Sequence, residues 1–509
     1  MRKIGFKPVN LIFPLLYIIL AVFGIMFFGT RSSFYYPYND WCDANSYFSV
    51  GKSMFNGVLP YRDVFDQKGP YLYFLYGLCY LISNKTFLGV FLMEIILGVF
   101  DVLGFFRILR LYLNETISLV LAPVCLAVSV ASYSFYMGGA AEEICLPCYV
   151  WGLYLILSYA KGRVGEKDLP MFLVKEGILA GLVANIKFTG LGFFFGVMLW
   201  ILIDLLLKKN IKKKVLYLLK TCLWFLFGFI LPFIPWLIYF SSKDGLYYWY
   251  WGYVDVNVFS YSNFGGEGPS IMERIKGLIK ILYYLIQKDM IYFIFIIPGM
   301  VYSVIQGKIK LWGRLLVPVL FAFLFLGIYV GGSELPYYAL PLSVFAIFGF
   351  ALLGKLMGIL FGILIDKTAL FKGIFLALGI MVSAALVFIL SMNVPAHDIK
   401  KEDHFLTKCA AIIESSGIED PTLLNVNCLD AGLYTVAGIV PNCQWFQTQT
   451  INSDVPYEEQ ARYIKEGLID FVLARDAYPA VTIDSYDMVL EIPWSHEGYN
   501  SVYYLFRKK

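Results

Sequence analysis

The chain has little charge and very little histidine for its length. Only 15% of its 509 residues are charged, and all three histidines, His397, His404 and His496, stand near the C-terminal end. The preceding sequence therefore offers no imidazole as a metal ligand or proton carrier, so acid–base chemistry there falls to carboxylates. The net charge of +4 is too small and too scattered to indicate nucleic-acid binding.

Familiar catalytic signatures are also missing. The sequence has no Walker A loop, no Gly-x-Ser-x-Gly elbow and no His-Glu-x-x-His motif. Cys145 and Cys148 lie three positions apart within an apolar run, where we expect them to pack inside a helix. Cys428 and Cys443, in the C-terminal tail, are candidates for a disulfide.

What the chain has in abundance is apolar sequence. Hydrophobic residues make up 59% of it and the mean hydropathy is +0.69, values typical of a polytopic membrane protein. Runs of about 17 to 25 apolar residues are each long enough to cross about 30 Å of hydrocarbon. We predict about eleven spans on this criterion. They lie near 9–29, 87–106, 115–133, 141–160, 172–186, 189–207, 215–240, 290–306, 314–330, 335–353 and 373–392.

The basic residues predict the orientation. They precede the first span and then recur in alternate loops: Arg2, Lys3, Lys7, Arg107, Arg110, Lys161 to Lys167, Lys208 to Lys214, Lys308 to Arg314, and Lys355 to Lys372. By the positive-inside rule we expect a cytoplasmic N-terminus and a tail outside the cell membrane. The first span follows a basic segment without a small-residue cleavage site, so we expect an uncleaved anchor.

Two segments depart from the spanning pattern. The apolar run 70–83 is too short to cross, and we predict a re-entrant or surface-lying helix on the outer face. After residue 393, polar helical and short apolar strand patterns alternate. We therefore predict a membrane domain over 1–393, with a long first outer loop at 30–86, and a small extracytoplasmic α/β domain over 394–509. We expect its Trp445-Phe446 pair to dock on the membrane domain's loops rather than bind acceptor.

With this orientation, the acidic residues near the membrane gather outside. They are Asp40, Asp43, Asp63, Asp66, Glu142, Glu143, Asp255, Glu267 and Glu334. Any one of them alone is most simply a solvated loop charge, but convergence from distant loops favours a functional site. Lys68, beside Gly69-Pro70 at the start of a predicted helix, is well placed to bind a phosphate. Lys187 is a second candidate, although a lysine near a helix end also commonly extends to lipid headgroups.

The first outer loop carries a recognisable pattern. It reads Asp43, Tyr47, then Gly57-x-x-Pro60-Tyr61-Arg62-Asp63, and finally Asp66-Gln67-Lys68-Gly69-Pro70. This resembles the loop of GT-C glycosyltransferases of the protein O-mannosyltransferase and aminoarabinose-transferase type. Glu142-Glu143 at a span's start, Lys187-x-Thr189-Gly190 and Tyr337-Tyr338-x-x-Pro341 extend the resemblance. Ala44 replaces the family's usual Glu, and Gln67-Lys68-Gly69-Pro70 replaces His-Lys-Pro-Pro.

The resemblance implies roles for these residues. Asp43 would be the general base of an inverting transfer, with Asp40 as the alternative, and Lys68 and Lys187 would hold the lipid phosphate. Tyr61, Asp63 and Asp66 would be sugar contacts or loop structure. Glu142 and Glu143 would bind acceptor hydroxyls or a divalent cation, or cap their helix, and Tyr337 and Tyr338 would bind substrate. We expect no cofactor; a divalent cation is compatible with this set but is not predicted.

The expected function is transfer of a sugar from a polyprenyl-phosphate donor to a glycan, lipid or protein acceptor at the outer face of the membrane. This would serve cell-envelope glycan modification. Two alternatives remain: a flippase or transporter of lipid-linked sugars, and a non-catalytic subunit of polysaccharide assembly. The chain shows no internal repeat, a feature common in transporters, and its charges crowd one face.

Overall fold

The computed structural model describes residues 9–207, 214–260, 270–305, 311–331, 334–365, 369–449, 451, 453–496 and 499–509. Several residues used to predict the orientation lie outside this set: Arg2, Lys3, Lys7, Lys208, Lys209, Lys212, Lys213, Glu267, Lys308, Lys310 and Lys367. The described chain divides into two compact units. We call them the bundle unit (9–30, 93–234 and 270–394) and the sheet unit (31–92, 235–260 and 395–509).

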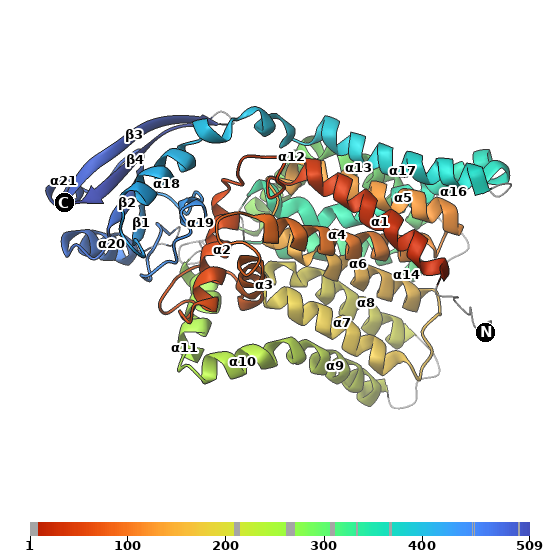
Figure 1. Ribbon diagram of the computed structural model, residues 1–509. Helices are drawn as coiled ribbons and strands as arrows, with labels where there is room; N and C mark the ends of the chain where they lie inside the picture. The colour runs from red at the N-terminus through yellow and green to blue at the C-terminus, as the bar shows by residue number, and fades with distance from the viewer. Residues whose placement is uncertain are drawn as a thin grey trace. The chain divides into compact units, whose positions relative to one another are not determined.

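The bundle unit consists of helices (Figure 1). Their bounds are α1 Val9–Gly29, α4 Leu88–Leu109 (whose first turn belongs to the sheet unit), α5 Glu115–Val130, α6 Ala141–Ala160, α7 Leu169–Ala184, η2 Phe188–Leu191, α8 Gly192–Leu207, α9 Lys214–Ile230, α12 Ile271–Lys288, α13 Met290–Ile305, α14 Leu311–Arg314, α15 Leu316–Tyr329, η5 Pro336–Ala346, α16 Ile347–Ile365 and α17 Ala369–Leu390. Each predicted span coincides with one of these helices or with a consecutive pair, except 215–240, which continues from α9 through η3 Leu231–Phe233 into α10 Ile234–Ser241.

The helices confirm a multi-pass membrane protein. Among the described residues, six helices are long and apolar enough to cross a membrane, and the pair α12 and α13, bent by 113°, would make a seventh. Three shorter apolar helices, Phe13–Gly29, Glu115–Val130 and Leu316–Tyr329, lie at other predicted spans. The total of about eleven crossings remains a prediction.

Helix α12 is absent from the sequence prediction. Charged residues at 273, 274, 276 and 280 interrupt its apolar pattern, so no run reaches the length of a span. A local signal marks its start: the Ser270 backbone N donates to Glu273 Oε2 at 2.8 Å, and the Glu273 backbone N donates to Ser270 Oγ at 3.3 Å. This reciprocal capping box fixes the helix N-terminus.

Glycine allows the closest helix packing in the bundle unit. A Cβ placed on Gly177 of α7 would lie 2.1 Å from the Phe225 carbonyl oxygen, and one on Gly228 of α9 would lie 2.2 Å from the Val174 carbonyl oxygen. No side chain fits between these backbones. The small residues therefore let α7 and α9 pack in direct backbone contact.

The sheet unit contains the long first loop and the tail. Its loop helices are α2 Cys42–Phe55, α3 Pro70–Tyr80, α10 Ile234–Ser241, α11 Leu246–Trp249 and the π-helix η4 Tyr250–Ser260. The tail contains η6 Val394–Asp398, η7 Lys401–Asp403, α18 Phe405–Ser415, β1 Leu423–Val426, α19 Leu433–Val436, α20 Val455–Lys465, β2 Phe471–Arg475, α21 Val481–Ser485, β3 Tyr486–His496 and β4 Tyr499–Lys508.

The four strands form one sheet in the order β1-β2-β4-β3 (Figure 1). β1 and β2 run parallel, with Leu424 opposite Val472, and β4 runs antiparallel to β2, with Phe506 opposite Val472. The short strands β1 and β2 are almost wholly buried, whereas β3 and β4 form a long hairpin at the edge. The predicted small C-terminal α/β fold is thus confirmed.

The apolar run after Pro70 forms the 11-residue helix α3, too short to span a membrane, as predicted. Pro70 occupies its first turn, where a missing N–H is tolerated. α3 packs tightly on α2, because a Cβ on Gly51 would lie 2.6 Å from both the Gly77 nitrogen and the Tyr73 carbonyl oxygen. Gly51 is therefore required for this close approach.

The Trp445-Phe446 pair docks on loops, as expected. Trp445 is 3% exposed, and its ring centre lies 4.9 Å from that of Phe65 and 6.5 Å from that of Trp251. Phe446 is fully buried, edge-on to Tyr434. These rings join the tail to the first loop and to η4 in one hydrophobic core.

The suggested disulfide is not formed, since Cys428 and Cys443 are both free thiols. Burial raises the pKa of each to about 12, so both remain protonated and unreactive at neutral pH. The sequence showed only that both cysteines lie in the tail; it contained no information on the geometry that a disulfide needs.

One face of α2 is both polar and buried. Asn45, Ser46, Ser49 and Lys52 lie at helical spacing and bond to the tail. The bonds run from Thr435 Oγ1 to Asn45 Oδ1 (3.1 Å), from Ser46 Oγ to Gln447 Oε1 (2.8 Å), from Ser49 Oγ to Asp430 Oδ2 (2.6 Å), and from Lys52 Nζ to the carbonyl oxygens of Tyr434 (3.0 Å) and Ile439 (3.1 Å).

We expect Lys52 to make the stability of the sheet unit depend on pH. Burial lowers its pKa to about 7, against the opposing charge of Asp430. A neutral amine has two N–H donors, which match its two carbonyl acceptors. Between about pH 7 and pH 10.5, Lys52 is protonated in the unfolded chain but largely neutral in the folded one. Because the unfolded chain binds more protons in this window, the free energy of unfolding rises with pH. This contribution of Lys52 is lost as the pH falls towards 7.

The measurement is the thermal midpoint of the purified protein between pH 7 and 8.5. Wild type should gain about 1.4 kcal/mol per pH unit relative to Lys52→Met, whose side chain has a similar length and no charge. Lys408→Met, at an exposed position of α18, is the matched control and should keep the wild-type slope. An unchanged slope in Lys52→Met would contradict the assignment.

Candidate functional site

Asp43 lies in the first turn of α2, where the helix dipole favours a carboxylate. Tyr47, one helical turn further on, donates its hydroxyl hydrogen to Asp43 Oδ2 at 3.0 Å. Asp43 is partly exposed, whereas Tyr47 is 1% exposed. The buried tyrosine thus holds the accessible carboxylate in one orientation.

Lys68 lies immediately before α3, and its Nζ is 5.8 Å from the centre of the Tyr47 ring. Two tyrosines fix its backbone: its N–H donates to Tyr73 Oη, and Tyr61 Oη donates to its carbonyl oxygen, both at 2.7 Å. Tyr61 is fully buried. Tyr61 thus makes a structural contact within the loop, and the sugar contact expected of it stays a prediction.

Asp66 lies beside Lys68 and accepts a hydrogen bond from Tyr73 Oη at 2.9 Å. It is 7% exposed, and burial raises its pKa; Lys68 opposes that shift and Asp43 adds to it. The three charged groups therefore share one electrostatic environment. We call Asp43, Tyr47, Asp66, Lys68 and Tyr73 the loop cluster.

Asp63 takes part in a turn instead. It accepts hydrogen bonds from the Arg62 guanidinium at 2.7 and 2.8 Å and from the Leu59 backbone N at 3.1 Å. The Arg62 hydrogen bond lowers its pKa. Both members of the pair are more than a third exposed, and the bonds describe a solvated loop.

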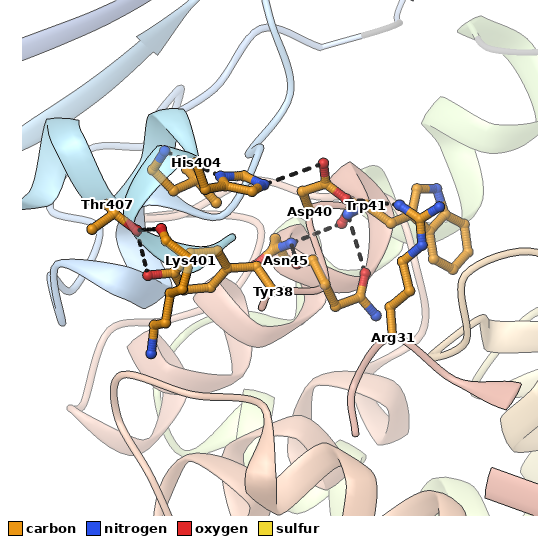
Figure 2. Close-up of polar contacts among 10 residues, drawn as sticks. Arg31, Tyr38, Asp40, Trp41, Asn45, Lys401, His404 and Thr407 are labelled. Carbon is orange, nitrogen blue, oxygen red and sulfur yellow. Dashed lines mark hydrogen bonds and ion pairs between the residues drawn. The ribbon is translucent and has the colours of Figure 1, made fainter. Parts of the chain in front are cut away.

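Asp40, the alternative base, lies between Arg31 and the imidazole of His404 (Figure 2). Its Oδ1 lies 3.2 Å from Arg31 Nη1, and its Oδ2 lies 3.8 Å from His404 Nε2. The Arg31 side chain is 1% exposed and that of Asp40 is 12% exposed. Asp40 therefore neutralises a buried guanidinium, which would be costly to leave unpaired.

A second group of predicted residues comes together in the bundle unit. Lys187, just before η2, forms an ion pair with Glu142 in the first turn of α6. Its Nζ also lies 3.5 Å from the centre of the Tyr338 ring and 5.4 Å from that of Tyr337. We call Glu142, Lys187, Tyr337 and Tyr338 the Lys187 cluster, in which the lysine contacts one acid and two aromatic rings.

Glu143 has a separate role. Its Oε2 accepts a hydrogen bond from the Gly139 backbone N at 2.7 Å, and its side chain is buried. Gly138 and Gly139 have φ values of 85° and 83°, which a side chain would strain. Glu143 thus closes the glycine turn before α6, the capping role predicted as one alternative.

Two tyrosines of the loop cluster were missing from the predicted site. Tyr47 stands four residues after Asp43, so both lie on one helix face, a spacing that could have identified it. Tyr73 carries no comparable local signal, because its contacts with Asp66 and Lys68 depend on how the chain turns at Gly69-Pro70. Within the described residues, no three His, Cys, Asp or Glu side chains are arranged to hold a metal ion.

Comparison with known proteins gives the class: a multi-pass membrane protein whose fold is similar to that of GT-C glycosyltransferases. Residues 67–239 match the model of the family described as dolichyl-phosphate-mannose-protein mannosyltransferase. The resemblance predicted from the first outer loop is confirmed.

Solved structures are similar in fold over nearly the whole chain. ArnT from Cupriavidus metallidurans bound to undecaprenyl phosphate matches with a TM-score of 0.63 and 10% identity, over 98% of both chains. The same protein in the apo state gives 0.59 and 11%, again over 98% of both. An Archaeoglobus fulgidus oligosaccharyltransferase with zinc and sulfate gives 0.48 and 12%, over 96% of this chain and 72% of that one. No curated protein sequence matches the chain.

We expect Glu142 and Lys187 to be energetically coupled. The side chains are 5% and 13% exposed, so removing one partner leaves a charge poorly solvated. Glu142→Gln and Lys187→Met should each lower the thermal midpoint, and the double variant should lose less than the sum, with a coupling free energy of about 1–3 kcal/mol.

The control for this cycle is Glu459→Gln, which breaks the exposed Glu459–Arg462 pair and should change stability little. Strict additivity of Glu142→Gln and Lys187→Met would show that the ion pair contributes nothing.

Proposed function

We propose that this protein is an inverting glycosyltransferase that moves a sugar from a polyprenyl-phosphate donor to an acceptor hydroxyl. The observation that carries the proposal is the loop cluster, in which Asp43 and Lys68 both approach Tyr47, one through its hydroxyl and the other through its ring. A base and a cation held near one rigid side chain are what such a transfer requires. The ArnT fold, seen with undecaprenyl phosphate bound, supports a lipid-phosphate donor.

The proposed reaction uses Asp43 as the general base. Its carboxylate takes the acceptor hydroxyl proton as the oxygen attacks the anomeric carbon from the side opposite the phosphate. The bond between that carbon and the phosphate oxygen breaks, which inverts the anomeric centre and releases polyprenyl phosphate. Lys68 stabilises the charge that develops on the leaving phosphate.

The remaining polar residues are assigned supporting roles. Asp40 anchors Arg31, as its ion pair suggests. For the Lys187 cluster, taken by itself, the proposed role is substrate binding, with the Lys187 ammonium held by Glu142. The reaction is proposed to need no resident cofactor or metal.

The orientation follows from charge placement. We assign the N-terminus to the cytoplasm and the tail to the outer side of the cell membrane, because the basic residues fall in alternate loops. The acceptor is then a component of the cell envelope, such as a glycan, glycolipid or protein.

The first test is release of polyprenyl phosphate in liposomes that contain a panel of polyprenyl-phosphate sugars. Asp43→Asn should lower the rate by about 10² to 10⁴, because a positioned base contributes that much, while the thermal midpoint stays near that of wild type. Asp244→Asn is the matched control; Asp244 is exposed in the same unit, and its φ of 52° suits asparagine. The assay is repeated with EDTA, which should leave the rate unchanged.

Equal release by wild type and Asp43→Asn would move the base elsewhere. No release with any donor, together with movement of labelled lipid-linked sugar between leaflets, would instead establish the flippase alternative.

The contribution of Lys68 to kcat can be tested separately from that of Asp43. Lys68→Met keeps the apolar stem and removes the charge, so it should lower kcat by about 10² or more through lost stabilisation of the leaving phosphate. Lys68→Arg should recover part of the rate, because the cation is restored with different geometry. Lys408→Met, exposed on α18 in the same unit and outside the loop cluster, should behave as wild type. A Lys68→Met enzyme with normal kcat would remove Lys68 from the mechanism.

A further inference from the structure

A cavity of about 480 Å³ lies within the sheet unit, and no residue of the loop cluster lines it. Its walls come from the segment 31–39 after α1, Asn45 of α2, the segment 85–88 at the start of α4, and the tail at 397–401 and 432–436. This volume is within the range of sites for small organic ligands.

The charged side chains that line the cavity are all basic. Arg31, Lys85, Lys401 and His397 line it, and no aspartate or glutamate does so among the described residues. Acidic partners outside the lining compensate only in part: Asp40 pairs with Arg31, and Glu414 lies 3.9 Å from Lys85 with both side chains exposed. The ammonium groups of Lys85 and Lys401, both exposed, therefore favour an anion in this recess.

Aromatic rings form the floor for a ligand. Tyr35 stacks on His397 with ring centres 4.0 Å apart and an angle of 9°, and His397 Nδ1 lies 2.9 Å from the Tyr35 carbonyl oxygen. Tyr38 Oη lies 2.9 Å from Thr407 Oγ1, and Lys401 Nζ is 5.3 Å from its ring centre (Figure 2). Rings fixed in this way offer a flat apolar surface at little entropic cost, which suits the C–H face of a sugar.

Hydrogen bonds join the walls to one another. Asn84 Nδ2 donates to the Gly438 carbonyl oxygen at 3.2 Å, and Thr435 Oγ1 donates to Asn45 Oδ1 at 3.1 Å. The site is therefore built across the first loop and the tail rather than by one flexible segment. Further hydroxyl and amide groups for sugar hydroxyls line it: Ser32, Ser33, Asn39 and Thr86.

We propose that this cavity binds an acidic sugar, a pyranose that carries a carboxylate or a phosphate, as part of the acceptor glycan. The aromatic side chains would pack against the pyranose ring, and the basic side chains would bind its carboxylate or phosphate. Its identification with the acceptor rests on the proposed transferase function, whereas the binding itself does not.

The experiment is calorimetric titration of the full-length protein in nanodiscs of neutral phosphatidylcholine. The probes are trigalacturonate for a carboxylate, glucose 6-phosphate for a phosphate, and maltotriose as the neutral comparison. At least one acidic probe should bind about tenfold more tightly than maltotriose, and rising salt should weaken it. The double variant Lys85→Gln/Lys401→Gln, at exposed positions, should lower that affinity by about tenfold or more.

The control variant is Lys408→Gln, exposed on α18 and outside the lining, which should bind as wild type. Asp43→Asn should also bind normally, since its defect is in turnover. Failure of both acidic probes to bind wild type, or equal binding by the double variant, would overturn the proposal while leaving the transferase assay unaffected. Thermal stabilisation by phosphatidylglycerol nanodiscs that depends on Lys85 and Lys401, without sugar binding, would also overturn it and assign the cavity to lipid headgroups.

Discussion

The polar face of α2 is the constraint on which the sheet unit depends. Asn45, Ser46, Ser49 and Lys52 are buried, and buried polar groups are costly unless each has a partner. Their partners come from the tail, almost four hundred residues later in the chain. Asp43 lies in the first turn of this same helix, so the tail that satisfies the polar face also fixes the position of the proposed base.

Much of the fold follows from local sequence. Each predicted span coincides with a helix, because a lipid environment demands long apolar runs with internally satisfied backbones. The Gly69-Pro70 boundary correctly separated α3 from the spans, and the alternating tail patterns gave the α/β fold. Helix α12 was missed because its charges break the apolar run, although its capping box was readable. The sequence could not show that the first loop and the tail share one compact unit, since their contacts are between residues far apart in the chain.

In the candidate site, too, local spacing was predictable from the sequence, whereas tertiary partners were not. Spacing along one helix could have related Asp43 to Tyr47, which the predicted site omitted, whereas the motif placed Lys68 before α3. Sequence could not assign Glu142 to Lys187 and Glu143 to the glycine turn, because neighbouring residues on a helix point in different directions and only the tertiary partners decide their roles. Asp40 and Asp43 posed the same problem: they are three residues apart, yet one meets a buried arginine and the other a tyrosine hydroxyl.

This arrangement also explains why a polar helix suits the site better than an apolar one. An apolar α2 would pack in several registers with little difference in energy, whereas hydrogen bonds to Asp430, Gln447 and two tail carbonyls fit only one. A half-satisfied network is worse than none, so the loop and the tail must be ordered together. Closing the long chain between them costs conformational entropy, which is offset only when both are ordered. The proposed base therefore reaches its working position only when the C-terminal residues have folded, and the membrane helices alone do not complete the site.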